Sequence, residues 1–230
     1  MRNFLKISLM AITLMFLFNV FAVTKTNAQR NPKAEALKRM DDHNKALSSL
    51  KANVKMEKYN EQIDTTDITE GSVIYLPQRG KKPYVRIDWT KPAEESMAVV
   101  NNQYIIYRKR LNQVMTGSVN QASGNAKAGG ALAFINMSKA ELMANYEIMY
   151  VGQETALGVP TWHLQLTPKK RTSYKVADLW VNKDGMPIKA KVTENNNDIT
   201  TVELSAIKEN ETINASVFSI DIPKDAKRIK

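Results

Sequence analysis

The chain contains no cysteine and only two histidines, His43 and His163. The absence of cysteine excludes disulfide bonds, thiolate nucleophiles, zinc–cysteine centres and a lipid-modified N-terminal cysteine. Two histidines are too few for a histidine-rich metal centre, and the acidic residues do not have the spacing of a calcium loop. No G-x-S-x-G motif occurs either. We therefore predict a protein that is not an enzyme, with no catalytic residues, no metal site and no cofactor.

The chain does have enough apolar sequence for a sizeable core. It has 230 residues, of which 43% are hydrophobic, and this length fits one domain better than two. The formal net charge of +10 suggests anionic partners without identifying them. We find no internal repeat and no linker, so residues 29–230 are predicted to form a single domain.

The N-terminus has the three-part pattern of a secretory signal peptide. Arg2 and Lys6 form a basic start, Ile7 to Val23 is an uncharged apolar run, and Ala28 ends a small-residue cleavage site. The alternative is an uncleaved anchor, but the apolar run is shorter than the ~20 residues of a typical span. We expect cleavage after Ala28 and export from the cytoplasm. An exported protein has no nucleotide supply and no access to chromosomal DNA, which argues against nucleic-acid partners.

Two helical segments are predicted. Asn31 is a capping residue, Pro32 suits a first helical position, and an apolar stripe follows at helical spacing. The residues of this stripe are Leu37, Met40, Leu47, Leu50 and Val54. Ser138 and Glu141 have the spacing of a capping box, which predicts a short second helix through about Asn145. Residues 118–130 between these segments are rich in Ser, Asn, Gly and Ala and are predicted to be a flexible loop.

The remaining sequence alternates in the manner of β-strands. We count about eleven short strands with short connections, which favour antiparallel pairing. Asn101-Asn102 and Asp184-Gly185 mark hairpin turns. The predicted fold is mainly β, of the α+β class, with one large curved sheet and two helical pieces.

Apolar residues on several strands suggest a cavity. A curved sheet with only two short helical covers cannot easily fill its concave side, although each residue alone is more typical of an ordinary core. The strand residues in question are Val85, Ile87, Trp89, Met97, Val99, Trp162, Leu164, Leu166 and Trp180. His163 alternates with Trp162 and Leu164 and should point away from them. The alternation predicts that Ile87→Glu leaves the protein folded but abolishes ligand binding in this cavity.

An ordered series of motifs resembles the outer-membrane lipoprotein carrier family, LolA. In the first half the series is Lys82-Pro83 before the strand ending at Trp89, then Lys91-Pro92, Asn101-Asn102-Gln103-Tyr104 and Leu111-Asn112-Gln113-Val114. In the second half it is Leu166-Thr167-Pro168-Lys169, Trp180, Asp184-Gly185 and Phe218-Ser219-Ile220-Asp221-Ile222-Pro223. The likeness extends over about residues 33–229.

The resemblance implies a specific architecture and role. It implies an incomplete antiparallel barrel of eleven strands, with helices over an apolar cavity that shields lipoprotein acyl chains. Ile87 and Trp89 match inward-facing positions, and Ala131 to Met137 matches a movable lid, which adds Leu132, Phe134 and Ile135 to the cavity set. Lys82 corresponds to a basic residue that contacts the lid. In this family's transport pathway, the carrier passes lipoproteins to an outer-membrane acceptor that carries a lipidated cysteine. Because this chain has no cysteine, the resemblance implies that it is the soluble carrier.

The partners implied by the resemblance are acylated lipoproteins, an inner-membrane release complex and an outer-membrane acceptor, and we expect a monomer. Two alternatives remain open. The same fold can carry or sense another lipid, and a sheet with a filled concave side can serve as a non-catalytic protein-interaction module.

Overall fold

The computed structural model describes residues 31–78, 82–118, 134 and 137–229. The chain divides after residue 31, and residues 32–230 form one compact unit, to which the following description applies. The predicted signal peptide (residues 1–28) lies outside the described residues, as do Leu132 and Ile135 and almost all of the predicted loop at 118–130. Within the described residues, no helix is both long enough and apolar enough to cross a membrane.

Among the described residues, twelve strands form one sheet, which confirms a mainly β fold. The strands are β1 (Leu50–Asn60), β2 (Thr65–Leu76), β3 (Tyr84–Lys91), β4 (Glu95–Val100), β5 (Gln103–Arg108), β6 (Gln113–Ser118), β7 (Tyr146–Ala156), β8 (Val159–Pro168), β9 (Tyr174–Asn182), β10 (Pro187–Glu194), β11 (Ile199–Glu209) and β12 (Lys227–Ile229). Their order is β12-β6-β5-β4-β3-β2-β1-β11-β10-β9-β8-β7. The sheet is therefore open, with β7 and β12 as its edges.

All neighbouring strands pair antiparallel except β12, which runs parallel to β6. The predicted sheet of about eleven antiparallel strands differs from the structure by this one short strand. A three-residue strand has too little alternation to be found in the sequence, and its parallel partner is more than a hundred residues away.

Both predicted hairpin turns are present, and their sequences explain them. Asn101 and Asn102 have φ values of 50° and 66°, the left-handed conformation that asparagine tolerates and that a tight hairpin requires. Gly185 has φ 90° in the turn between β9 and β10. A Cβ at Gly185 would lie 2.1 Å from the carbonyl oxygen of Arg39, so this glycine also lets a helix pack against the turn.

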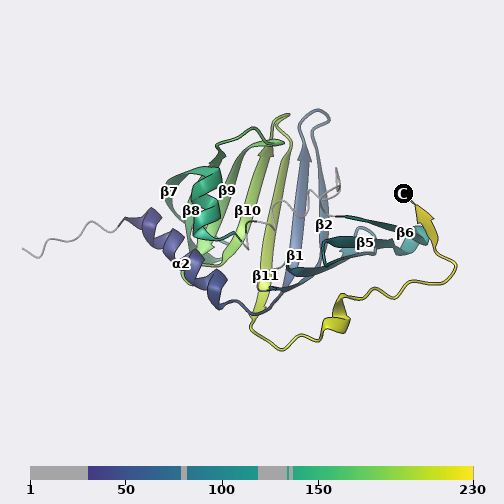
Figure 1. Ribbon diagram of the computed structural model, residues 1–230. Coiled ribbons are helices and arrows are strands. Elements are labelled where there is room, and N and C mark those ends of the chain that lie inside the picture. The colour runs from purple at the N-terminus through teal and green to yellow at the C-terminus, as the bar shows by residue number, and fades with distance from the viewer. Residues whose placement is uncertain (1–30, 79–81, 119–133, 135–136, 230) are drawn as a thin grey trace, which may run out of the picture. The chain divides into compact units, whose positions relative to one another are not determined.

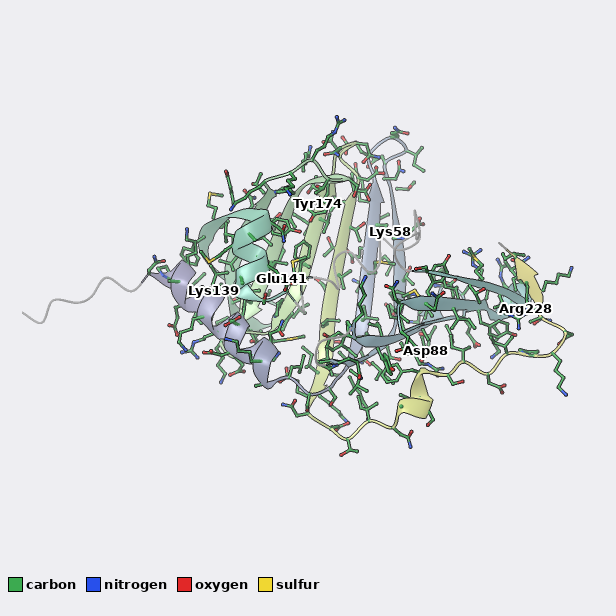
Figure 2. The ribbon with its side chains drawn as sticks, viewed as in Figure 1. Lys58, Asp88, Lys139, Glu141, Tyr174 and Arg228 are labelled. Carbon is green, nitrogen blue, oxygen red and sulfur yellow. The ribbon has the colours of Figure 1, made fainter. Side chains whose placement is uncertain are left out.

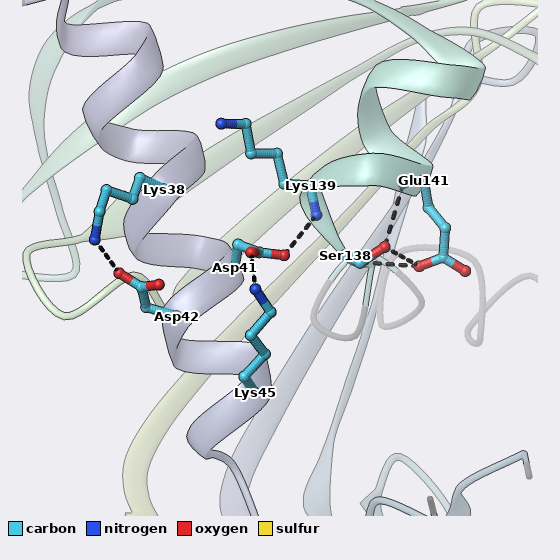
Figure 3. A network of polar contacts seen from close by, with 7 residues as sticks. All are labelled: Lys38, Asp41, Asp42, Lys45, Ser138, Lys139 and Glu141. Carbon is cyan, nitrogen blue, oxygen red and sulfur yellow. Dashed lines mark hydrogen bonds and ion pairs between the residues drawn. The ribbon is translucent and has the colours of Figure 1, made fainter. Parts of the chain in front are cut away.

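Helix α2 (Pro32–Ala46) provides that contact, and α4 (Lys139–Asn145) is the second helix. The α4 capping box is complete, with Ser138 Oγ accepting from the Glu141 N–H and the Glu141 carboxylate accepting from the Ser138 N–H (Figure 3). The predicted extent of the first helix was wrong. Leu50 and Val54 belong to β1, where they alternate with exposed or half-buried neighbours, and a spacing of four residues fits a strand as well as a helix.

The face of the sheet on which α2 and α4 pack is called the inner face here. The two helices lie over the β7–β10 part of the sheet (Figure 1). Their buried residues, among them Leu37, Met40 and Leu142, join one continuous core with inner-face side chains of β1–β3 and β7–β11. The β4–β6 part continues the sheet beyond these helices (Figure 1).

The opposite, outer face of β3 and β4 is covered by the segment after β11, which includes the short 3-10 helix η4 (Ala215–Phe218). Arg86 of β3 holds this segment by donating to the carbonyl oxygens of Val217 (2.7 Å) and Ser219 (2.9 Å). Its guanidinium also pairs with Asp88 at 2.7 Å (Figure 2 labels Asp88). Because this segment is held against β3, the chain can return to the β6 edge and add β12.

Candidate functional site

The strand register brings most of the predicted cavity residues onto the inner face. Val85 lies opposite Val99, and Ile87 opposite Met97, so both pairs share one face with Trp89. On β8, the residues Trp162, Leu164 and Leu166 reach the same face of the sheet through the pairing of β8 with β9. An alternating pattern was sufficient to predict this because successive strand residues point to opposite faces.

Burial then separates a completely buried group from a half-buried group, and the half-buried residues are Val85, Met97, Val99 and Trp162. Ile87, Leu164 and Leu166 are 0% exposed and belong to the packed core. Phe134 is also buried, with its ring 5.9 Å from that of Tyr146 and 6.5 Å from that of Tyr174. Residues packed in this way are not available to a ligand unless the core around them opens.

A pocket of about 250 Å³ opens on the inner face, where β1–β5 meet, and is called the Lys58 pocket here. Its lining residues are Met56, Lys58, Thr69, Trp89, Pro92, Ala93, Glu95, Met97, Ile106 and Arg108. Met56, Trp89 and Ile106 are buried and form an apolar floor. The volume lies just below the ~300–1,000 Å³ of typical small-molecule sites. A second hollow of about 620 Å³ shares Pro92 and Ala93 with it and is otherwise lined by Glu94, Lys109 and Arg110.

Only Trp89 and Met97 of the pocket residues were predicted. The others were missed for identifiable reasons. Assigning Leu50 and Val54 to a helix hid the alternation Val54, Met56, Lys58, which points β1 side chains into the pocket. Ile105 and Ile106 are adjacent and apolar, so the sequence does not say which of them faces inward.

Charge in the pocket is concentrated in three side chains. Arg108 Nε donates to Glu95 Oε2 at 2.9 Å, and each of these side chains is about one-third exposed. Lys58 is half-buried and has no hydrogen-bond or ion-pair partner for its ammonium group among the described residues. The pocket therefore combines an apolar floor with one unpaired positive charge.

The placement of Trp180 corrects the sequence-based assignment. Leu179 and Val181 occupy inner-face positions on β9, so Trp180 between them lies on the outer face. Its indole stacks on His163, with ring centroids 4.5 Å apart, and donates to Glu154 Oε2 at 2.7 Å. Trp180 is thus not part of the inner-face pocket.

His163 points away from Trp162 and Leu164, as the alternation predicted. It lies between two carboxylates, with Nδ1 2.7 Å from Glu154 Oε1 and Nε2 2.9 Å from Asp178 Oδ1. Glu154, His163, Asp178 and Trp180 are called the outer-face cluster here. Hydrogen bonds from Trp180 and then His163 hold the pKa of Glu154 below its usual value.

Two further predictions concern the lid-contacting role of Lys82 and the expected lack of a metal site. Lys82 is exposed, just before β3, and the lid residues that the resemblance pairs with it lie outside the described residues, except Phe134 and Met137. In the part of the chain that the structure describes, no group of three or more His, Cys, Asp or Glu side chains is placed to hold a metal ion.

Comparison with known proteins gives a family and a fold. The model of the family described as outer membrane lipoprotein carrier protein LolA matches residues 45–221, which is most of the chain. No curated protein matches the chain.

Solved structures share the fold at low sequence identity. A chain of the Pseudomonas aeruginosa MucA/MucB complex is 13% identical, with a TM-score of 0.52 over 83% of this chain and 61% of that one. An uncharacterised conserved protein from Thermus thermophilus is 13% identical, with a TM-score of 0.55 over 86% of this chain and 98% of that one. The chain therefore spans about three-fifths of the MucA/MucB relative and nearly all of the Thermus protein.

Proposed function

Because the chain belongs to the LolA family of outer membrane lipoprotein carrier proteins, we propose that it is a non-catalytic carrier that shields lipoprotein acyl chains on its inner face. The observation that carries this proposal is the Lys58 pocket, whose floor is apolar and whose mouth is open on the inner face. In this proposal the protein is exported to the periplasm and moves its cargo from an inner-membrane release complex to an outer-membrane acceptor.

The physical basis of such a carrier is simple. Each CH₂ group of an acyl chain contributes about 0.8 kcal/mol when it leaves water for an apolar surface. At about 250 Å³ the pocket takes only part of a long acyl chain. The remaining length needs further apolar surface, and the inner-face core under Phe134, α2 and α4 provides it if these elements move.

Binding of an apolar chain at this pocket can be tested with a fluorescent probe. The delipidated protein is titrated with the methyl ester of dansyl-undecanoic acid, which has a long apolar chain and no charge. Met97→Trp places a larger side chain in the pocket and should weaken binding at least tenfold. Met149→Trp makes the same change at an exposed outer-face position of β7 and should leave binding unchanged.

The result that would refute the proposed site is equal binding by both variants and the parent protein. Absence of probe binding by the parent protein would instead favour the non-catalytic interaction module, in which side chains fill the inner face.

The nature of the cargo needs a separate experiment. We would purify the protein from the periplasm of its own host and examine it by native mass spectrometry with lipid extraction. A bound acylated protein supports lipoprotein carriage. A bound free lipid supports the alternative, a carrier or sensor of another lipid within the same family.

A further inference from the structure

Lys58 occupies an unusual position for a lysine. It follows Val54 and Met56 on the inner face of β1, and its neighbours across the sheet are Asp67 of β2 and Thr200 of β11. Figure 2 shows it on β1, between the β7–β10 part of the sheet and the strands β3–β6. Its side chain is half-buried against the pocket rather than free in solvent.

The other charges of the pocket cancel each other. Arg108 and Glu95 form a direct pair, so neither brings an unbalanced charge to a ligand. Asp67 faces Lys58 across the two strands, but it is exposed and forms no ion pair with Lys58. The lining of the pocket therefore has a net charge of +1, which comes from Lys58, beside an apolar floor.

This combination defines a class of ligand. An apolar chain gains free energy by leaving water for this pocket, where it contacts the half-buried Met97 above the buried Met56, Trp89 and Ile106. A negatively charged head group at the mouth gains a charge-assisted hydrogen bond from the Lys58 ammonium, and a positively charged one is repelled. A head group without charge makes neither interaction.

We propose that the Lys58 pocket selects amphiphiles with an anionic head group, whose carboxylate or phosphate pairs with Lys58 while the chain lies on the apolar floor. This inference rests on the proposed function and names the chemistry of its ligand. It assigns Lys58 as a specificity-determining residue rather than a general surface charge.

The test compares two probes that differ only at the head group. Delipidated protein is titrated with dansyl-undecanoic acid, an anion at neutral pH, and with its uncharged methyl ester. The parent protein should bind the acid about tenfold more tightly than the ester, the size of effect expected for one partly exposed charge-assisted hydrogen bond. Lys58→Gln should remove this preference and leave the affinity for the ester unchanged.

Lys55→Gln is the matched control. Lys55 lies on the same strand, faces the other side of the sheet and pairs with Glu57, and its replacement changes the net charge equally. It should keep the full preference for the acid. Loss of the preference in this variant as well would overturn the proposal, because long-range charge would then explain it.

Three other results would also refute all or part of the proposal. Equal affinity of the parent protein for acid and ester would overturn the anionic specificity while leaving acyl-chain binding intact. Failure to bind either probe would overturn both proposals. Displacement of the acid by inorganic phosphate alone at comparable concentration would show a simple anion site. This result would overturn the proposal that the ligand is an amphiphile.

Discussion

The carboxylate of Asp41 in α2 accepts a hydrogen bond from the backbone N–H of Lys139 in α4, with Oδ1 and N 3.3 Å apart (Figure 3). Its other oxygen accepts from Lys45 Nζ at 2.6 Å, and this bond is the main reason why the pKa of Asp41 is lowered. The first N–H groups of a helix have no partner within the helix, and a carboxylate there is favourable. Asp41 therefore links α2 to α4, the two helices that cover the β7–β10 part of the inner face.

The first prediction tests this hydrogen bond between the helices. Asp41→Ala should lower the free energy of unfolding by about 1 kcal/mol, since it removes the acceptor of an otherwise unpaired helix N–H. Asp42→Ala is the control, because Asp42 is its neighbour and pairs with Lys38 in an exposed i,i+4 contact. It should cost less than about 0.5 kcal/mol. Urea unfolding measures both, and equal losses would refute a specific role for Asp41.

The second prediction reverses one made from the sequence. Ile87→Glu should unfold the protein rather than leave it folded without cargo, because Ile87 is 0% exposed within the core. Burying a carboxylate there costs about 4 kcal/mol or more. Ile87→Val, which keeps the site apolar, should cost only about 1 kcal/mol. Urea unfolding and soluble yield distinguish the two, and a stable Ile87→Glu variant would show that this part of the core opens to solvent.

The contrast between Ile87 and Met97 shows what an alternating sequence pattern does not predict. The two residues are opposite each other on adjacent strands and face the same side. Alternation predicts the face of each, because the period of two is fixed by strand geometry. It does not predict that one is completely buried and the other lines an open pocket, since that depends on packing partners from distant segments.

Trp180 and Lys58 illustrate two other limits. Trp180 lies between the apolar residues Leu179 and Val181, so hydrophobicity alone did not show its face, although Asp178 two residues earlier shares that face. Lys58 is a charged residue in a mainly apolar pocket, and only the pairing of Arg108 with Glu95 reveals that it is the unbalanced charge. In contrast, the turns at Asn101-Asn102 and Asp184-Gly185 were predictable because they depend on local backbone geometry.

The third prediction concerns the aromatic cluster of Phe134, Tyr146 and Tyr174. Phe134 is 2% exposed between the two tyrosine rings, whose hydroxyl oxygens are 2.6 Å apart. Phe134→Ala should lower the free energy of unfolding by about 3 kcal/mol, because it leaves a cavity in the core. Tyr174→Phe, which removes one hydroxyl and keeps the ring, should cost about 1 kcal/mol. Urea unfolding measures both, and similar costs for the two variants would show that Phe134 contributes little to the packed core.

The fourth prediction uses the pH dependence of the outer-face cluster. The hydrogen bond from Trp180 is the largest cause of the lowered pKa of Glu154, followed by that from His163. A carboxyl group whose pKa is lowered by folding stabilises the protein above its unfolded pKa of 4.5. This contribution is lost as the pH falls through the lower pKa of the folded state.

Trp180→Phe keeps the stacking on His163 but removes the indole N–H that binds Glu154. Because the Glu154 side chain is 43% exposed, we expect a cost of only about 1 kcal/mol at pH 7. The difference in unfolding free energy between parent and variant should stay constant at pH values well above the unfolded pKa of 4.5 and shrink as the pH falls below it. Trp162→Phe, the control, lies on the inner face without a carboxylate partner among the described residues, so its cost should not depend on pH. A parent–variant difference for Trp180→Phe that grows as the pH falls would contradict the assigned hydrogen bond, since protonated Glu154 is the weaker acceptor.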